Sequence, residues 1–359
     1  MTVLKNVLHK GTVTDIVLSG GKIESIGKTE LPGIELSGLK VYPGLIDTHI
    51  HGALGHDVSD PHDSLDVISD YELRSGVTTW YPTTVAVDAE QLVKVTNRDV
   101  SLVSGANIPG FHMEGPFINK AKKGAINEEH IIPASRELFD RCNASGLVKK
   151  MTVAPETEGA LEFIEDCPAL ISVGHTTCDY DTAAESFRRG ARCLTHTYNV
   201  MPGIHHREPG PIGAGADSKD IYAELISDGV HIHPSAVRML VRIYGTDRIV
   251  LVSDSVRATG LSDGEYDLGG VPTVVKDGVA RTLGGNLAGS TTNLFDCVRC
   301  AISFGICEED AVKMASDNPA RMMGLNKGRV EVGYDADLII VDGDFNLKHV
   351  IKGGELCVL

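Results

Sequence analysis

Two histidines separated by one residue, His49 and His51, follow an apolar run in the segment GLIDTHIHGALGHD. In an extended strand residues i and i+2 point to the same face, so both imidazoles project together while Thr48 and Ile50 face away. A pair of imidazoles can ligate a divalent metal such as zinc, iron or manganese. An H-x-H pair alone is not diagnostic, because a histidine at the end of a strand is more often simply hydrogen-bonded.

Six more polar side chains come directly after apolar segments that we expect to be strands. They lie at the ends of HMEG, VGHT, LTHTYN, ISDGVHIH and LVSDS and are Glu114, His175, His196, Asn199, His231 and Asp254. Imidazole and carboxylate groups are the ligands that catalytic metals take, and a carboxylate can also transfer protons. If the fold brings these strand ends together, the sequence predicts a metal site.

The middle of the chain alternates between strand candidates and helical stretches. The eight strand candidates are GLIDTHI, VTTWYPTTV, IPGFHMEG, KKMTVAPE, LISVGHT, CLTHTYN, YAELISDGVHI and RIVLVSDS. Eight such units in roughly 280 residues fit an α/β fold of the (β/α)8 TIM-like barrel type, in which catalytic residues collect where the strands end. A doubly wound sheet is the alternative, but no G-x-G-x-x-G follows the first strand.

Both ends of the chain differ in sequence pattern from the middle, because they contain short strand candidates and glycine turns such as LSGGKI and LPGIELSG. This pattern predicts that the two termini pair into one small β-sandwich domain. We expect residues 1–43 plus 331–359 to form that domain and residues 44–330 to form the barrel.

The charge balance limits the possible partners. The chain has 33 basic and 49 acidic residues, a net charge of −16, so we expect neither nucleic acid nor membrane as a partner, and an anionic small molecule would need a local basic pocket. No apolar run approaches the ~20 residues of a membrane span, and the N-terminus has no apolar signal core. The eight scattered cysteines are typical of reduced thiols, so we expect a cytoplasmic protein.

Several motifs carry a resemblance to a known family. HMEGPFIN and THTYNVMPGIHHREPG, supported by PGLIDTHIHG, KKGAIN, VGHT, ISDGVHIH, LVSDSVRATG, LGGNLAGS and NPARMMGL, resemble the amidohydrolase superfamily and, within it, the N-acetylglucosamine-6-phosphate deacetylase family. The resemblance covers nearly the whole chain. It implies a distorted (β/α)8 barrel with a small β domain from both termini, and hydrolysis of N-acetylglucosamine 6-phosphate to glucosamine 6-phosphate and acetate.

The resemblance also implies roles for single residues. Glu114, His175 and His196 would bind the main metal, His49 and His51 a second metal, and Asp254 would be the catalytic acid/base. Arg207, in the basic segment HHREPG, resembles an arginine that binds the phosphate in the neighbouring subunit's site, which implies a homodimer. The implied substrate contacts are Ala125, Ile126, Asn199, Val200, Arg207, His231, Leu287, Ala288 and Gly289.

The chemistry of amide hydrolysis agrees with these roles. A metal can lower the pKa of a bound water to ~7 and polarise the acetyl carbonyl, so that the metal-bound hydroxide is the nucleophile. The amine cannot leave as an anion, and Asp254 can take the proton from the water and return it to the nitrogen. The planar guanidinium of Arg207 suits phosphate oxygens.

The sequence departs from the family pattern at Ile126. After KKGA most family members have a polar residue, commonly histidine, that reaches toward the acetyl group, whereas isoleucine can donate no hydrogen bond. A second cation beside the acetyl carbonyl would supply the missing stabilisation. We therefore favour two ions per subunit, sharing Glu114, over one ion, with zinc, iron or manganese as candidates.

Three alternatives stay open. The first is an N-acetylgalactosamine-6-phosphate deacetylase, because no residue distinguishes the two epimers. The second is a cyclic amidohydrolase, but those enzymes carry a metal-bridging lysine at the end of strand four, where this chain has VAPE. The third is a catalytically inactive scaffold, which would be expected to have lost ligands that are all present here.

Overall fold

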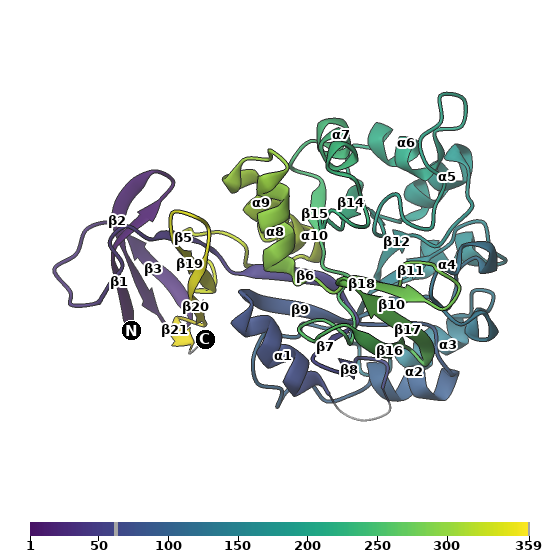
Figure 1. The fold of residues 1–359 in the computed structure, drawn as a ribbon, viewed down its shortest axis with the longest axis horizontal. Helices are drawn as coiled ribbons and strands as arrows, with labels where there is room; N and C mark the ends of the chain where they lie inside the picture. The colour runs from purple at the N-terminus through teal and green to yellow at the C-terminus, as the bar shows by residue number, and fades with distance from the viewer. Residues whose placement is uncertain (61–63, 358–359) are drawn as a thin grey trace.

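A helix-covered barrel and a separate sheet make up the computed structural model, which describes residues 1–60 and 64–357 (Figure 1). The barrel strands are β6 (Leu45–Ile50), β9 (Val77–Thr84), β10 (Phe111–Glu114), β11 (Val148–Val153), β12 (Leu170–Val173), β13 (Cys193–Leu194), β14 (Tyr222–Leu225) and β15 (Ile249–Leu251). They pair in parallel in this order, and each coincides with one strand candidate of the sequence. The predicted (β/α)8 barrel is confirmed.

The first and last barrel strands are joined by backbone hydrogen bonds at the mouth. β6 and β15 are not neighbours in the sheet order, but the N–H of Asp254 donates to the carbonyl of His49 at 2.9 Å, and the N–H of His51 donates to that of Ser255 at 2.8 Å. These hydrogen bonds close the barrel where the first strand carries its two histidines. Backbone closure therefore brings Asp254 next to the H-x-H pair.

Helices cover the outside of the barrel, and several of them begin at a side chain that caps the first turn. Asp179, for example, accepts from the N–H of Thr182 at the start of α5, which satisfies an N–H that has no partner within the helix. None of the helices among the described residues is long and apolar enough to cross a membrane. The helices are α1 (Leu65–Arg74), α2 (Ala89–Thr96), α3 (Arg136–Cys142), α4 (Ala160–Asp166), α5 (Tyr180–Arg189), α6 (Gly210–Asp217), α7 (Pro234–Tyr244), α8 (Leu294–Ser303), α9 (Glu308–Met314) and α10 (Asp317–Met323).

One helical segment is shorter than its sequence indicates. The run DAEQLVKVTNRDVSLVSG forms α2 only as far as Thr96. Asn97 then caps the helix by donating to the carbonyl of Val93 at 2.8 Å, and the carboxylate of Asp99 accepts from the N–H of Ser101, which starts a turn. Side chains that bond the local backbone thus end the helix early.

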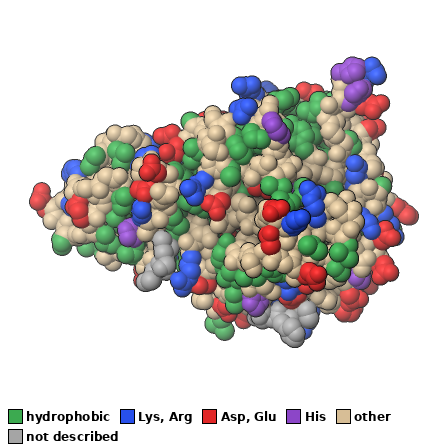
Figure 2. Space-filling model, in the orientation of Figure 1, with side chains coloured by type: hydrophobic (Ala, Val, Ile, Leu, Met, Phe, Trp, Pro, Cys, Tyr) green, Lys and Arg blue, Asp and Glu red, His purple; other side chains and the backbone are tan. Residues whose placement is uncertain are grey.

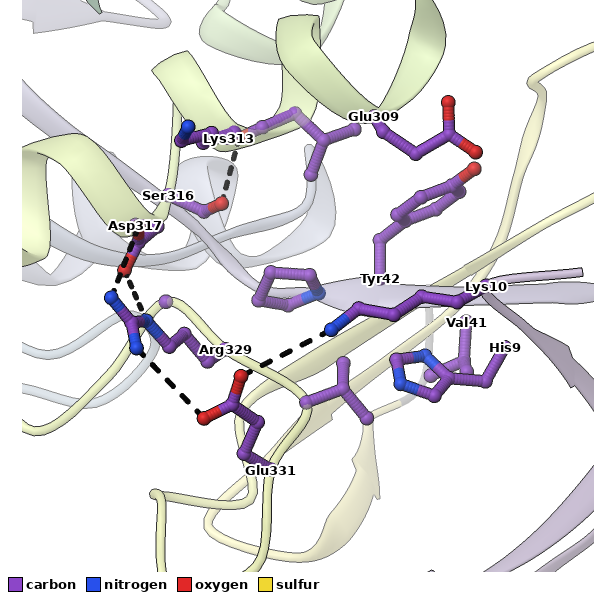
Figure 3. A pocket seen from close by; sticks show the side chains of 14 residues that line it. His9, Lys10, Val41, Tyr42, Glu309, Lys313, Ser316, Asp317, Arg329 and Glu331 are labelled. Atoms are coloured by element: carbon purple, nitrogen blue, oxygen red, sulfur yellow. Dashed lines mark hydrogen bonds and ion pairs between the residues drawn. The ribbon is translucent and has the colours of Figure 1, made fainter. Parts of the chain in front are cut away.

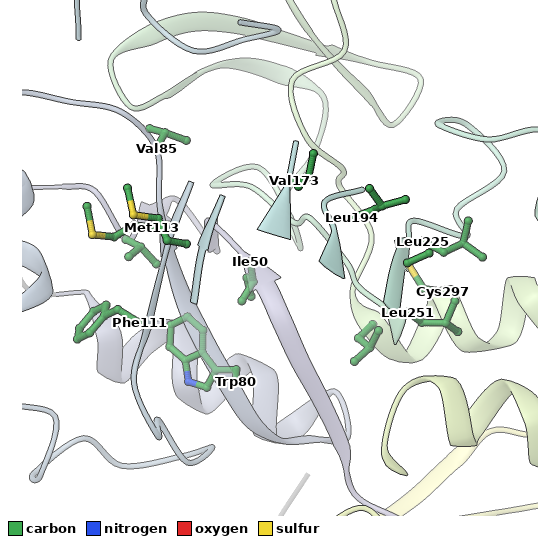
Figure 4. Packing of buried hydrophobic residues seen from close by; sticks show 14 of the residues in the cluster. Ile50, Trp80, Val85, Phe111, Met113, Val173, Leu194, Leu225, Leu251 and Cys297 are labelled. Carbon is green, nitrogen blue, oxygen red and sulfur yellow. The ribbon is translucent and has the colours of Figure 1, made fainter. Parts of the chain in front are cut away.

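The apolar core lies between the strands and the helices, and the inside of the barrel is polar. Figure 4 shows buried side chains such as Trp80, Phe111 and Leu251 in this cluster. Within the barrel, Thr195 Oγ1 lies 3.0 Å from Thr152 Oγ1 and 2.6 Å from Ser172 Oγ, and all three side chains are buried. Hydrogen-bonded polar side chains therefore fill the space beneath the mouth.

Both termini contribute to the second sheet. Its strands are β1 (Thr2–His9), β2 (Thr12–Ser19), β3 (Lys22–Ile26), β4 (Ile34–Glu35), β5 (Lys40–Pro43), β19 (Leu338–Val341), β20 (Leu347–Lys352) and β21 (Glu355–Cys357). β5 pairs with β19, so segments almost 300 residues apart in the sequence are joined. This sheet has its own buried core, which includes Leu4, Ile16 and Leu338. The pairing of the termini is confirmed, and the domain limits 1–43 plus 331–359 and 44–330 stay a prediction.

Two further sheets were not predicted. β16 (Gly264–Leu268), β17 (Val271–Lys276) and β18 (Val279–Thr282) form an antiparallel sheet after the last barrel strand, and β7 (Gly52–Ala53) pairs with β8 (His56–Asp57) after the first. The segment that follows β18 contains Leu287 to Gly289, and Ser290 pairs with Ser255 in an isolated bridge. This bridge brings the segment back to the barrel mouth.

A cavity of about 300 Å³ lies at the junction between the terminal sheet and the barrel (Figure 3). Its charged side chains point toward one another, with Arg329 2.5 Å from Asp317 and 3.9 Å from Glu331, which lies 4.0 Å from Lys10. These ion pairs join α10 to the turn between β1 and β2, where Lys10 lies. The cavity therefore belongs to the packing of the two parts of the chain.

We expect Asp15→Asn to destabilise the terminal sheet. The buried Asp15 carboxylate accepts from the N–H groups of Asn6 and Thr29 at 2.9 and 3.0 Å and pairs with Lys5 at 2.8 Å. These hydrogen bonds, together with Lys5, hold the pKa of Asp15 well below its usual value. An asparagine would turn an amide N–H toward these donors, at a cost of about 2–3 kcal/mol.

Chemical denaturation at neutral pH measures this loss, and Asp70→Asn, at an exposed ion pair with Arg74, is the matched control with an expected change below about 0.5 kcal/mol. Because the folded-state pKa of Asp15 is lowered, its contribution is present above the unfolded pKa of about 3.9 and disappears as the pH falls below that value. The wild type should thus lose stability below about pH 4 more steeply than the variant. Equal stability of Asp15→Asn and Asp70→Asn would contradict this account.

Candidate active site

Six potential metal ligands meet at the mouth of the barrel in two groups. Glu114, His175 and His196 form the first ligand group, and His49, His51 and Asp254 form the second ligand group. Within each group the ligand atoms lie within 4.8 Å of one another, and all six side chains are buried. The structure therefore brings together the six residues for which the sequence predicted metal binding or acid/base catalysis.

Glu114, at the end of β10, lies between the two groups. Its Oε1 is 3.1 Å from His175 Nε2, 3.0 Å from His196 Nε2 and 3.4 Å from His49 Nε2, and its Oε2 is 3.3 Å from His51 Nε2. Oε1 thus faces the first ligand group and His49, and Oε2 faces His51, so this carboxylate borders both groups and could contribute to a metal site in either.

The imidazoles present Nε2 to the centre of the mouth. His51 Nδ1 lies 3.1 Å from the carbonyl of Thr83 and His175 Nδ1 lies 2.8 Å from that of Lys122, so each Nδ1 donates its proton outward. His49 Nε2 is buried without a hydrogen-bond partner in the described part of the chain. An imidazole nitrogen buried among carboxylates without a donor or acceptor fits a site that binds a cation.

The backbone at the mouth is strained. His175, His196 and Asp254 have φ values of 47°, 27° and 50°, in a region that residues with a side chain rarely adopt. Such conformations cost about 1–3 kcal/mol each and cluster at functional sites. Here they occur within three residues of the end of a barrel strand, and all three side chains line the cavity at the mouth.

The electrostatics at the mouth favour positive charge. Burial opposes protonation of His49, but the charges of Glu114, Glu224 and Asp254 outweigh it and raise the pKa of His49 to about 9. Burial likewise opposes ionisation of Glu114, yet the neighbouring His175 and His49 hold the pKa of Glu114 well below its usual range. A bound divalent cation would replace the protons that otherwise balance these carboxylates.

A layer beneath the ligands contains residues that the sequence analysis missed. Glu224 in β14 accepts from His49 Nδ1 at 3.1 Å and forms a buried ion pair with Lys150 in β11. Burial opposes ionisation of Glu224, but Lys150 and His49 lower its pKa to about 2. The ring of His112 packs edge-on against His49, with centroids 4.6 Å apart. Glu224 and Lys150 were detectable as charged residues inside strand candidates.

A cavity of about 420 Å³ opens above the ligand groups, a size suited to a small polar molecule. His231 lines it, with its Nδ1 2.7 Å from Asp228 Oδ2. Seven of the predicted substrate contacts form part of the cavity wall: Ala125, Ile126, Asn199, Val200, His231, Leu287 and Gly289. Ala288, between two of them, is fully buried and does not line the cavity. Lys120, Lys122, Lys123 and Asn286, which were not predicted, also line the cavity.

Arg207 does not line this cavity. It lies on an exposed loop before α6, where its Nη1 is 2.7 Å from His206 Nε2 and the rings of His205 and His206 are 4.2 Å apart. In Figure 2 histidine and basic side chains gather on a projection in this region of the molecule. The structure thus separates Arg207 from the other predicted site residues of the same chain.

Comparison with known proteins reveals similarity over the whole chain. The amidohydrolase family model matches residues 41–357. The N-acetylglucosamine-6-phosphate deacetylase of Bacillus subtilis strain 168 is 36% identical over 333 residues, which is 88% of this chain and 84% of that protein. The N-acetylgalactosamine-6-phosphate deacetylase of Escherichia coli O157:H7 is 34% identical over 352 residues, 94% of this chain and 93% of that protein.

A solved structure is similar along its full length. It is a mutant of the Mycobacterium smegmatis N-acetyl-D-glucosamine-6-phosphate deacetylase in complex with N-acetyl-D-glucosamine-6-phosphate. The TM-score is 0.92 at 30% sequence identity, covering 99% of this chain and 98% of that chain.

Proposed function

The chain belongs to the amidohydrolase family, and we propose that it hydrolyses the N-acetyl amide of N-acetylglucosamine 6-phosphate to glucosamine 6-phosphate and acetate. The observation that carries the proposal is the pair of buried ligand groups that share Glu114 at the floor of a sugar-sized cavity. The full-length similarity to deacetylases supports the substrate.

The residues at the barrel mouth have different roles in the proposed reaction. The first ligand group would hold one divalent metal and the second ligand group another, with zinc, iron or manganese as candidates. When bound, these ions lower the pKa of the attacking water and polarise the acetyl carbonyl. The Asp254 carboxylate, which is deprotonated because the imidazoles lower its pKa against the effect of burial, takes the proton of that water and delivers it to the leaving nitrogen.

The walls of the cavity orient the sugar. The Asp228 carboxylate holds His231 Nδ1, so that the opposite edge of this imidazole is free for a sugar hydroxyl or the amide. Ile126 is almost completely buried and offers the acetyl group only an apolar surface. We assign stabilisation of the carbonyl oxygen to the cation side of the cavity for this reason.

Removal and return of metal tests the proposal directly. We expect that dialysis against a chelator abolishes acetate release and that zinc or iron(II) restores it. Activity that persists after the metal content has fallen below one ion in ten subunits would contradict metal-dependent hydrolysis.

The galactosamine epimer is the second candidate substrate. It is favoured by the similarity to the N-acetylgalactosamine-6-phosphate deacetylase, whose identity to this chain is close to that of the glucosamine enzymes. The cyclic amidohydrolase alternative gains no support, because Lys150 in the fourth barrel strand is paired with Glu224 beneath the mouth.

We further propose a homodimer in which Arg207 reaches the phosphate in the neighbouring active site. Arg207 is exposed and does not line the cavity of its own chain, which supports this role. A location in the cytoplasm stays a prediction of the sequence.

Arg207→Ala should then weaken turnover of the phosphorylated sugar by roughly 1.5–3 kcal/mol in kcat/KM, the range for hydrogen bonds to a charged group. The unphosphorylated sugar should be affected much less. In mixed dimers Arg207→Ala and Asp254→Asn subunits should partly restore activity, because one of the two sites then has both intact residues. An equal loss with both sugars, or full activity of a monomer, would contradict this role.

A further inference from the structure

A buried carboxylate beneath the mouth contacts both ligand groups. Glu224 Oε2 accepts from His49 Nδ1 at 3.1 Å and from the main-chain N–H of His196 at 3.1 Å. Its Oε1 pairs with Lys150, whose ammonium also donates to the carbonyl of Thr48 at 3.1 Å. The side chains of Glu224, Lys150 and His49 are fully buried. Both oxygens of this carboxylate are therefore engaged below the site.

The four ligand imidazoles differ in what their Nδ1 atoms face. Nδ1 of His51 and of His175 face main-chain carbonyls, and Nδ1 of His196 has no hydrogen-bond partner among the described residues. His49 is the one of the four whose Nδ1 faces a carboxylate. A charged acceptor forms the stronger hydrogen bond, fixes the proton on Nδ1 and makes Nε2 a better ligand.

We infer that Glu224 is a positioning residue of the second metal site, holding His49 in the tautomer and orientation that offer Nε2 to the metal. The inference rests on the two-ion site of the proposed function. His49 Nε2 already faces the space between the carboxylates, 3.4 Å from Glu114 Oε1 and 3.6 Å from Asp254 Oδ1. Among the described hydrogen bonds, Glu224 reaches the first ligand group through the backbone N–H of His196 and through no ligand side chain, so the first ion depends on it less.

The ion pair with Lys150 determines how the positioning role of Glu224 can be distinguished from a purely structural role. A change at Glu224 alone would leave a buried ammonium without a partner, which destabilises the barrel whatever the role of the carboxylate. Two double variants avoid this effect. Lys150→Met with Glu224→Gln removes both charges but keeps an oxygen that can accept from His49, and Lys150→Met with Glu224→Leu removes the acceptor as well.

The measurement is a titration of the metal-free full-length chain with zinc in competition with a chromophoric chelator, in the absence of sugar. We expect the second ion to bind 10–100-fold more weakly in the leucine double variant, the range for loss of such a hydrogen-bonding partner. The glutamine double variant should lie between it and the wild type, and the first ion should change little. Ser172→Ala, in the same buried layer, should bind both ions as the wild type does.

Three results would overturn the inference. They are a second ion bound by the leucine double variant with wild-type affinity, an equal loss at both sites, and a wild-type chain that binds a single ion. The titration contains no sugar, so its result does not depend on whether the substrate is assigned correctly. If the active enzyme instead binds a single ion, the inference about Glu224 fails, but the proposed deacetylase activity still stands.

If the double variants do not fold, a measurement on the wild type can still test the role of Glu224. Nitrogen-15 NMR of histidine-labelled, zinc-loaded protein, with the His49 signal identified from His49→Gln, should show a proton on Nδ1 and a ligating Nε2. An unprotonated Nδ1 would contradict the role of Glu224.

Discussion

Replacement of Asp254 by asparagine is expected to lower kcat by about 10²–10⁴-fold, the contribution of a general acid–base group. The variant keeps the shape of the side chain but removes its ability to take a proton from water and return it to the amine. The ion held by Glu114, His175 and His196 should remain bound, because Asp254 belongs to the other ligand group. Steady-state kinetics and metal analysis of the same preparation measure both quantities.

The same substitution at an aspartate outside the site distinguishes loss of acid–base catalysis from a general effect of replacing aspartate by asparagine. Asp181→Asn, at the exposed first turn of α5, should leave kcat unchanged. Near-normal turnover of Asp254→Asn would refute its role as acid/base, and loss of the ion from the first ligand group would show that the variant disturbs the site itself.

The second large effect concerns the H-x-H pair. We expect the wild type, purified with ample metal, to contain close to two ions per subunit, and His49→Gln with His51→Asn to lose one ion and most of the activity. The physical reason is the apolar side chain of Ile126 on the cavity wall: if the acetyl group binds against it, as we propose, the acetyl oxygen has no donor there, a deficit that typically costs about 2.7–4 kcal/mol. A second cation would provide this stabilisation.

Elemental analysis combined with kinetics tests this expectation, and His349→Gln in the terminal sheet is the control that should keep both ions. A fully active wild type with one ion per subunit would end the two-ion proposal. Ile126 would then indicate an altered substrate.

The barrel and its mouth could be predicted because their signals are local. Each barrel strand is a short apolar run, and the residues that follow it, such as His175 and Asp254, must lie at the same end of a parallel barrel. Side chains alternate between the two faces of a strand, which predicted that His49 and His51 share one face. In the structure the Nε2 atoms of both residues lie within 3.4 Å of the Glu114 carboxylate.

What could not be predicted depends on contacts between distant segments. Glu224 and Lys150 lie in different strands, and their pairing across the barrel interior follows only from its closure. Two other features have a local cause that hydrophobic periodicity does not reveal. Side-chain bonds of Asn97 and Asp99 to the nearby backbone end α2, and the carboxylate of Asp263 accepts from the N–H groups of Asp277 and Gly278 in the turn between β17 and β18. No sequence pattern indicated that Arg207 lies outside the cavity of its own chain. Only the family resemblance suggested a role for it in a neighbouring subunit.

The most direct test of the central claim is the rate of acetate release from four sugars by the metal-loaded chain, measured side by side. The sugars are N-acetylglucosamine 6-phosphate, its galactosamine epimer, and the two corresponding sugars without phosphate. We predict the highest kcat/KM for N-acetylglucosamine 6-phosphate, a clear loss without the phosphate, and no release after chelation. Absence of acetate release from both phosphorylated sugars by a chain that contains its metal would contradict the claim.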